Sequence, residues 1–283
     1  MGVKIIVDSA ADVAEQYRQK LTVVPLSVCF GEESYLDGVT LNKQEFYQKL
    51  VETDVLPTTS QATPDAFDQV FRQVALAGDS AVVITISSKL SGTYQSACIA
   101  AEDYDNIYVV DSLNVATGSG VLAEYALQCV DRGMGARELA EHLTKVREDV
   151  YVIALLDTLE YLKKGGRISK TVAFAGGVLN IKPVVSVVDG EVVLIGKARG
   201  SRQGNNLLEE KINACGGVDF SKPVLLGYTG ISDALLRKYM DDSRALWEGS
   251  TSDIDVTLVC SVIGTHVGPG AIVAAFFKNP EQK

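Results

Sequence analysis

The chain has 283 residues, of which 47% are hydrophobic and 22% charged, and its 26 Lys and Arg against 36 Asp and Glu give a formal charge of −10. This composition is typical of a folded globular protein and excludes a disordered chain. The negative charge argues against a nucleic-acid partner, because phosphate binding needs a cationic face. The length exceeds what one compact core usually holds, so we expect two domains, residues 1–155 and 156–283.

No apolar run approaches the roughly 18 residues that a membrane span requires. The N-terminal run reaches Asp8 too early to hold a secretory signal, and it is typical of a buried strand. We therefore expect a cytoplasmic protein without a transmembrane segment. The five cysteines are far apart and form no C-x-x-C pair, so we interpret them as small core side chains and expect neither a metal site nor a disulfide framework.

In the first half, runs rich in Val and Ile alternate with segments of helical period, which is typical of a mostly parallel sheet covered by helices. The predicted strands are residues 3–7, 81–86 and 107–110. The predicted helices are residues 12–20, 43–51, 64–77 and 136–147. The third of these begins at Thr63-Pro64-Asp65, which combines an N-cap, a proline in the first turn and an acid near the helix N-terminus.

After about residue 155 the pattern changes to that of a mixed α+β domain. We predict helices over residues 155–163 and 169–179 and strands near residues 224–228, 256–261 and 271–277. Residues 184–188 are expected to pair with 191–196 across Asp189-Gly190, because both central positions of a tight hairpin turn favour positive φ. The fold class is thus α/β, with the last strand as the one element that we allow to return to the first domain.

Two hydroxyl-rich segments are candidates for binding an anion. The run from Ser87 to Thr93 lies between a predicted parallel strand and a helix, where hydroxyls and N–H groups at a helix N-terminus favour a carboxylate or phosphate. Its central residues are Ser91 and Gly92. A second run, residues 57–64, contains Thr59 and Ser60 and is expected to be a loop that enters the next helix.

One histidine is a candidate site residue. His266 lies in the sequence Gly-Thr-His-Val-Gly-Pro-Gly, which we predict to be a glycine-rich turn leaving a buried strand. Clustered cations further suggest a docking patch or a phosphate contact in so acidic a chain. They include Arg167, Lys170, Arg199 and Arg202. The motifs of dinucleotide-binding proteins, P-loop proteins and standard α/β-hydrolases do not occur in the sequence.

Taken in this order, the segments resemble the DegV family, whose members include the fatty-acid-binding (FakB-type) subunits of bacterial fatty acid kinase. The resemblance runs over nearly the whole chain. It is carried by Asp8-Ser9, Thr59-Ser60-Gln61, residues 87–93, Asp111-Ser112, Gly165-Gly166-Arg167, Ile181-Lys182-Pro183, His266 and Gly268-Pro269-Gly270.

The resemblance implies a two-domain fold that encloses one long-chain fatty acid and uses no other cofactor. Thr59, Ser60, Ser91 and Gly92 then match the residues at the fatty acid carboxylate, with His266 beside them. Arg167, Lys170, Arg199 and Arg202 match a surface that docks a partner. Proteins of this type are carriers, not enzymes: a separate kinase subunit brings ATP and forms the acyl phosphate. A transient contact with a membrane surface is compatible with that role.

Two other interpretations use the same residues. In the first, Ser91 is the nucleophile and His266 the base of a hydrolase or acyltransferase, with Asp8 or Asp111 as the orienting acid. In the second, the chain is a regulatory module that binds a sugar or a phosphate in a polar cavity. Composition does not distinguish an apolar tunnel from a solid core, so the three interpretations differ first in what the interior holds.

Overall fold

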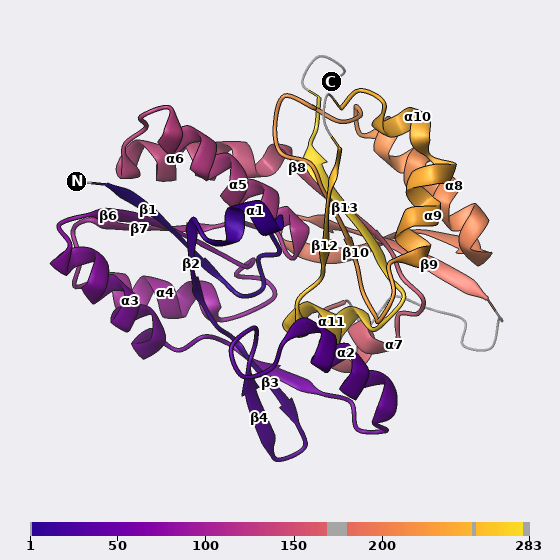
Figure 1. Ribbon diagram of the computed structural model, residues 1–283, viewed down its shortest axis with the longest axis horizontal. Helices are drawn as coiled ribbons and strands as arrows, with labels where there is room; N and C mark the ends of the chain where they lie inside the picture. The colour runs from indigo at the N-terminus through magenta and orange to yellow at the C-terminus, as the bar shows by residue number, and fades with distance from the viewer. Residues whose placement is uncertain (1, 169–179, 251–252, 280–283) are drawn as a thin grey trace.

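The computed structural model describes residues 2–168, 180–250 and 253–279, which form three sheets and the helices that cover them (Figure 1). The strands are β1 (Val3–Asp8), β2 (Leu21–Val24), β3 (Ser27–Phe30), β4 (Glu33–Leu36), β5 (Thr58–Ser60), β6 (Ser80–Thr85), β7 (Ile107–Asp111), β8 (Val150–Leu155), β9 (Ile181–Val188), β10 (Glu191–Arg199), β11 (Leu225–Tyr228), β12 (Asp255–Leu258) and β13 (Ile272–Phe277). The helices are α1 (Glu15–Arg18), α2 (Lys43–Glu52), α3 (Pro64–Leu76), α4 (Thr93–Ala101), α5 (Thr117–Asp131), α6 (Ala136–Val146), α7 (Glu160–Gly165), α8 (Gly200–Ala214), α9 (Ala234–Asp242), α10 (Arg244–Trp247) and α11 (Ser261–Val267).

The first half is built on a four-stranded sheet in the order β2-β1-β6-β7, in which all neighbours are parallel. Helices α3 and α4 lie on one face of it, and α5 and α6 lie on the other (Figure 1). Its central strands are buried on both faces, which is why they appear in the sequence as unbroken runs of Val and Ile. The mostly parallel α/β sheet and its three predicted strands are confirmed.

The second half is built on a six-stranded sheet in the order β10-β9-β8-β13-β11-β12, which is antiparallel except between β11 and β12. Helices α8 and α9 pack on one face, and α5 packs on the other. The predicted hairpin is confirmed as β9 and β10, with φ of 50° at Asp189 and 81° at Gly190. The last strand, β13, lies inside this sheet. Strand β8 also belongs to the six-stranded sheet, and it ends at residue 155, where we expected the domain boundary. The division into two domains at this residue stays a prediction.

A small antiparallel sheet, in the order β4-β3-β5, lies beside helices α2 and α11. The loop that we expected around Thr59 and Ser60 is wrong in part, because residues 58–60 form strand β5 and pair with β3. This pairing holds the backbone of Thr59 opposite Val28 and so fixes which way its side chain points.

Several predicted boundaries are wrong. The helix expected over residues 155–163 begins only at Glu160, because Leu155 is the last residue of strand β8 and residues 156–159 connect the strand to the helix. The segment 12–20 is helical only over Glu15–Arg18, and this short helix buries none of its residues. The strand expected over 256–261 ends at Leu258, and Ser261 instead begins helix α11. The helix predicted over residues 169–179 lies outside the described residues.

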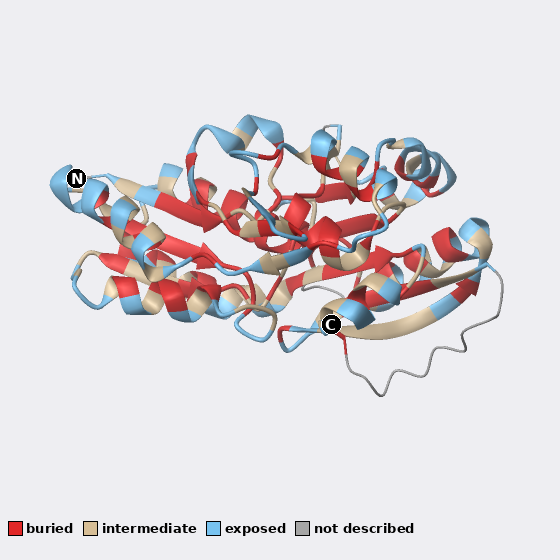
Figure 2. Ribbon diagram, turned by 90° about the horizontal axis from the view of Figure 1, so that it is seen from below, coloured by how far each residue is buried: buried red, intermediate tan, exposed pale blue. Residues whose placement is uncertain are grey.

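The apolar side chains gather in two clusters. The larger one fills the space between the four-stranded sheet, its helices and the inner face of the six-stranded sheet, and the smaller lies between the outer face of that sheet and helices α8 to α10. Figure 2 shows this as buried strands and helix faces inside the molecule with exposed residues outside. Of the helices in the described part of the chain, none combines the length and the apolar character needed to cross a bilayer.

Candidate functional site

A cavity of about 330 Å³ lies where the loops of the four-stranded sheet meet the six-stranded sheet and helix α11. Its size is within the roughly 300–1,000 Å³ range of small-molecule sites. Most of the wall is apolar. The strands of the six-stranded sheet contribute Val152, Ala154, Val185, Val187 and Val273 to it. The interior is thus suited to an apolar ligand.

The polar side chains gather on one part of this wall. Thr59, Ser60, Ser91, Gly92 and His266 all line the cavity, so the structure brings together five residues from three distant segments. The Thr59 hydroxyl lies 2.9 Å from Nε2 of His266, and the hydroxyls of Ser91 and Thr93 are 2.9 Å apart. We call these five residues the cavity mouth.

The turn that carries Ser91 is held from behind by two carboxylates. Asp8, at the end of β1, accepts hydrogen bonds from the backbone N–H of Ile86 at 2.7 Å and of Ala10 at 2.9 Å. Complete burial raises the pKa of Asp8 to about 7, although these two hydrogen bonds oppose the shift. Asp111, at the end of β7, accepts from the N–H of Ser88 at 3.1 Å. The parallel strands therefore place their terminal acids against the backbone of the turn.

His266 lies in the last turn of helix α11, so the prediction that it sits in a glycine-rich turn is wrong. The glycine that ends the helix comes two residues later, at Gly268, with φ of 71°. Gly165 packs directly on the imidazole, and a Cβ atom at that position would overlap the ring. Burial and the nearby Arg167 guanidinium lower the pKa of His266 to about 4, so the imidazole is neutral at pH 7.

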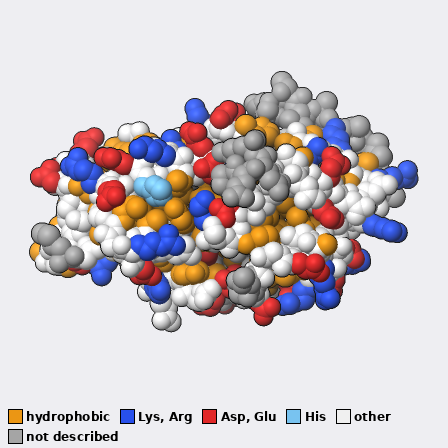
Figure 3. Space-filling model, turned by 90° about the horizontal axis from the view of Figure 1, so that it is seen from above, with side chains coloured by type: hydrophobic (Ala, Val, Ile, Leu, Met, Phe, Trp, Pro, Cys, Tyr) orange, Lys and Arg blue, Asp and Glu red, His pale blue; other side chains and the backbone are white. Residues whose placement is uncertain are grey.

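The predicted docking cations lie in different places. Arg167 lines the cavity, and its guanidinium donates to the carbonyl oxygens of Gly165 at 2.6 Å and Leu90 at 3.3 Å. Arg199 and Arg202 are exposed at the start of helix α8 and do not line this cavity. Lys170 lies outside the described residues. On the face shown in Figure 3, cationic and anionic side chains are interspersed and no single sign dominates.

Gln61 lies beside the cavity mouth, and the sequence interpretation did not assign it to the site. It lines the cavity, and its side-chain NH₂ donates to the Ser96 hydroxyl at 2.8 Å. A Cβ atom at Gly92 would overlap the Gln61 carboxamide, so a glycine is needed there for this close approach. The sequence did contain a signal for this role. Gln61 directly follows Thr59 and Ser60, so it lies at the same edge of the sheet as these two residues.

The arrangement does not support a serine nucleophile with a histidine base. Among the described residues, the hydroxyl of Ser91 pairs with Thr93 while His266 pairs with Thr59, and no hydrogen bond joins Ser91 to His266. The two acids proposed as orienting groups, Asp8 and Asp111, bind backbone N–H groups instead. Three His, Cys, Asp or Glu side chains that could hold a metal ion do not come together anywhere in the described residues.

Comparison with known proteins gives matches along the whole chain. Residues 2–279 match the family model described as "Uncharacterised protein, DegV family". A DegV domain-containing protein of Caldanaerobacter subterraneus subsp. tengcongensis is 32% identical, with 98% of this chain and 99% of the relative covered. One of Clostridium perfringens is 31% identical, with 97% and 98% covered.

Solved structures of DegV proteins are similar in fold to this chain over nearly its whole length. A DegV lipid-binding protein from Thermotoga maritima has a TM-score of 0.86 at 28% identity, with 98% of this chain and 99% of that chain covered. A fatty-acid-binding DegV family protein from Thermus thermophilus has a TM-score of 0.86 at 30% identity, covering 98% and 100%. A stearic-acid-binding protein from Eubacterium ventriosum has a TM-score of 0.85 at 29% identity, covering 98% and 99%.

Proposed function

This chain belongs to the DegV family, and we propose that it binds one long-chain fatty acid in the cavity, with the carboxylate at the cavity mouth. The observation that carries the proposal is the division of the cavity wall: hydroxyls and an imidazole at one part, and Val and Ala side chains elsewhere. An amphiphile with one polar end matches this division. A sugar would leave the apolar wall without a partner.

The apolar wall accounts for retention of the ligand. Transfer of about fifteen methylenes out of water is worth roughly 0.8 kcal/mol each, or on the order of 12 kcal/mol before the cost of ordering the chain. The head group must be matched as well, because a buried carboxylate without partners costs several kcal/mol. The hydroxyls of Thr59 and Ser91 can donate to it, and Gly92 precedes the first turn of helix α4, where N–H groups favour an anion.

The imidazole responds to the ligand in this proposal. In the free protein His266 is neutral, since burial and Arg167 hold its pKa near 4. A carboxylate beside the ring favours the cationic form and raises that pKa. Arg167 supplies a permanent cation at the same place. We propose further that the mouth presents the carboxylate to a separate kinase subunit, which supplies ATP and forms the acyl phosphate.

The test of binding is direct. We expect native mass spectrometry of the purified protein to show a fatty acid of common chain length, or the delipidated protein to take up oleate. Thr59→Val, Ser91→Ala and His266→Ala should each weaken oleate binding by about fivefold or more, because each removes a partner of a charged group. Ser88→Ala is the matched control, since Ser88 lies in the same turn but does not line the cavity. A protein that neither carries a fatty acid nor binds oleate contradicts the proposal.

The kinase step is tested separately, by mixing the oleate-loaded protein with a fatty acid kinase catalytic subunit and ATP. Acyl phosphate should form only when both proteins are present. If oleate binds but no acyl phosphate forms with a kinase that is active on another carrier, the binding proposal stands and the partner proposal is wrong.

A further inference from the structure

Helix α11 is both a wall of the cavity and the carrier of the mouth histidine. Val262, Ile263 and His266 from this helix line the cavity. The helix has only seven residues, and a helix of this length is not stable without tertiary contacts. Its position, and with it the position of the imidazole, therefore depends on what holds its ends.

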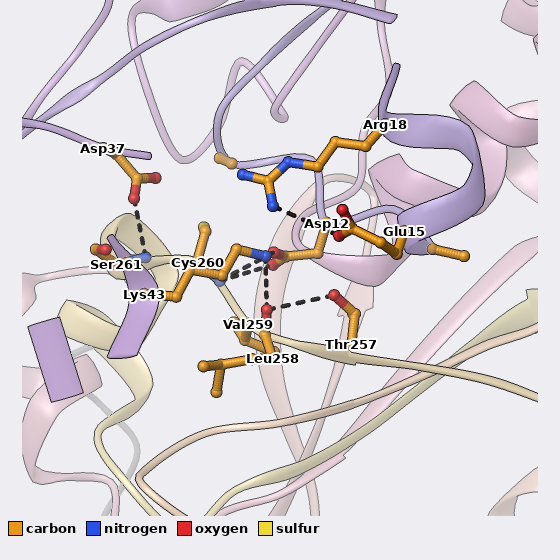
Figure 4. A network of polar contacts seen from close by, with 12 residues as sticks. Asp12, Glu15, Arg18, Asp37, Lys43, Thr257, Leu258, Val259, Cys260 and Ser261 are labelled. Carbon is orange, nitrogen blue, oxygen red and sulfur yellow. Dashed lines mark hydrogen bonds and ion pairs between the residues drawn. The ribbon is translucent and has the colours of Figure 1, made fainter. Parts of the chain in front are cut away.

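Two buried carboxylates hold its N-terminus, as Figure 4 shows. Asp12, in the loop after β1, accepts from the N–H of Cys260 at 2.9 Å and 3.2 Å with its two oxygens. Asp37, at the end of β4, accepts from the N–H of Ser261 at 3.2 Å. Their exposed fractions are 1% and 2%, so water does not compete for these hydrogen bonds. They satisfy N–H groups that the first turn of a helix leaves without partners.

A lysine joins this cluster to a second helix. Lys43, the first residue of α2, donates to Asp12 at 2.7 Å and to the carbonyl oxygen of Leu258 at 2.6 Å (Figure 4). The pair thus links the loop after β1, helix α2 and the chain that enters α11. Lys43 also neutralises a carboxylate that would otherwise be buried alone, which is costly.

The middle of α11 is placed by packing against α2. A Cβ atom at Gly264 would come within 2.6 Å of both Phe46 and Tyr47, so α11 lies directly against α2. The Tyr47 hydroxyl donates to the carbonyl oxygen of Val259, just before the helix. Helix α2 contacts α11 and also carries Lys43. The hydrogen bonds of Asp12, Asp37 and Lys43 and the packing of Phe46 and Tyr47 therefore act on the same pair of helices.

We propose that Asp12, Asp37 and Lys43 are positioning residues for His266, which fix the imidazole at the cavity mouth from the opposite end of helix α11. The proposal extends the proposed function, because it assigns to these three residues the geometry of the carboxylate site. None of them lines the fatty acid cavity.

Asp37 acts in this proposal as an acceptor and not as a charge. Its second oxygen, Oδ2, has no hydrogen-bond partner by distance and angle. Burial raises the pKa of its carboxyl, although the hydrogen bond from the Ser261 N–H opposes the shift. An amide oxygen at this position can accept from the Ser261 N–H equally well. We therefore expect Asp37→Asn to preserve the anchor and Asp37→Ala to release it.

The experiment compares these two variants in the delipidated protein. The chain has only two histidines, so a long-range ¹H–¹⁵N spectrum resolves both imidazoles and His142→Gln assigns them. At pH 5.5 the wild-type His266 ring should be neutral. In Asp37→Ala it should be largely protonated, because a displaced ring returns toward the ordinary pKa of about 6.5. The oleate dissociation constant should rise by roughly two- to thirtyfold, the factor that corresponds to loss of a helix cap.

Two further variants keep the result decisive. Ile212→Val, in the smaller core cluster, lowers stability without touching α11 and should leave the ring unchanged. Lys43 is half-buried, and in Lys43→Met the His266 ring should be protonated at pH 5.5 as in Asp37→Ala. This variant tests the positioning role if Asp37→Ala does not fold. A ring that stays neutral in both anchor variants, or that responds equally in Ile212→Val, overturns the proposal. Failure of every protein, wild type included, to bind oleate counts against the proposed function alone, since the ring is read in the absence of ligand.

Discussion

Buried acids at single positions shape how this protein responds to pH. Glu124, on helix α5, is 2% exposed and accepts a hydrogen bond from the N–H of Ala14 at 2.7 Å. Burial raises the pKa of its carboxyl to about 8, so the side chain is mostly protonated at pH 7. The unfolded chain, by contrast, loses this proton near the ordinary value of 4.5.

Because the folded state binds this proton more tightly, the stability that it contributes is complete below pH 4.5 and is lost as the pH rises through 8. We expect Glu124→Gln to have the stability of the wild type at pH 5 and to exceed it at pH 9 by an amount on the order of a few kcal/mol. Urea denaturation at the two pH values measures the difference. Glu141→Gln, on the exposed face of α6, should show no such change. A difference that is independent of pH contradicts the prediction.

The site residues were predictable to different degrees. The turn with Ser91 follows a Val-rich strand and precedes a helix, so its place at the end of a parallel strand follows from local pattern alone. The pairing of Thr59 with His266 joins residues 207 positions apart, and no local pattern indicates it. Their grouping came from the family resemblance. The role of Asp12 was not predicted, because its partners Lys43 and Cys260 are distant in sequence.

At the scale of elements, the β9–β10 hairpin forms part of the cavity wall and docks by its tip on the turn after β6. The Ser87 hydroxyl donates to the carbonyl oxygen of Gly190 at 2.7 Å. A Cβ atom at Gly190 would lie 2.5 Å from the same hydroxyl, and φ there is 81°. The tip has room for a glycine and nothing larger.

We expect Gly190→Ala to cost about 2–3 kcal/mol, from the positive φ and from the contact with Ser87 together. Gly78→Ala is the matched control, because Gly78 has φ of 69° and no atom near the added Cβ. It should cost only the backbone term of about 1 kcal/mol. Thermal unfolding of both variants measures the difference. Equal losses in the two variants would mean that the docking of the tip adds nothing.

Two helices with a polar and an apolar face were predicted from the sequence, and the almost entirely buried helix α5 was not. Helices α3 and α6 show the helical period because one face meets solvent. Helix α5 has twelve of its fifteen residues buried, so no polar face marks its period. Strand β8 was not predicted, because a short apolar run has the same pattern in a strand and in a buried helix, and only pairing with β9 and β13 decides.

For the whole molecule, the ligand is expected to act as part of the core. A ligand that binds only the folded state stabilises it by about 2.7 kcal/mol at one hundred times its dissociation constant. For a chain of this size we expect oleate at that level to raise the Tm of the delipidated protein by roughly 5–10 °C. Scanning calorimetry measures the shift. Methyl oleate, which has the same chain without the carboxylate, should give a smaller one, and an unchanged Tm with oleate would contradict the proposed function.

Helix α5 has a consequence for how cargo is exchanged. It packs against β1 and β6 of one sheet and against β8, β11 and β13 of the other, with Val121, Leu122 and Ala126 fully buried. Separation of the two sheets would expose these side chains to water, at a cost of about 1.5–3 kcal/mol for each large apolar side chain. We therefore expect the proposed fatty acid to enter and leave through small displacements of the rim, without separation of the two sheets.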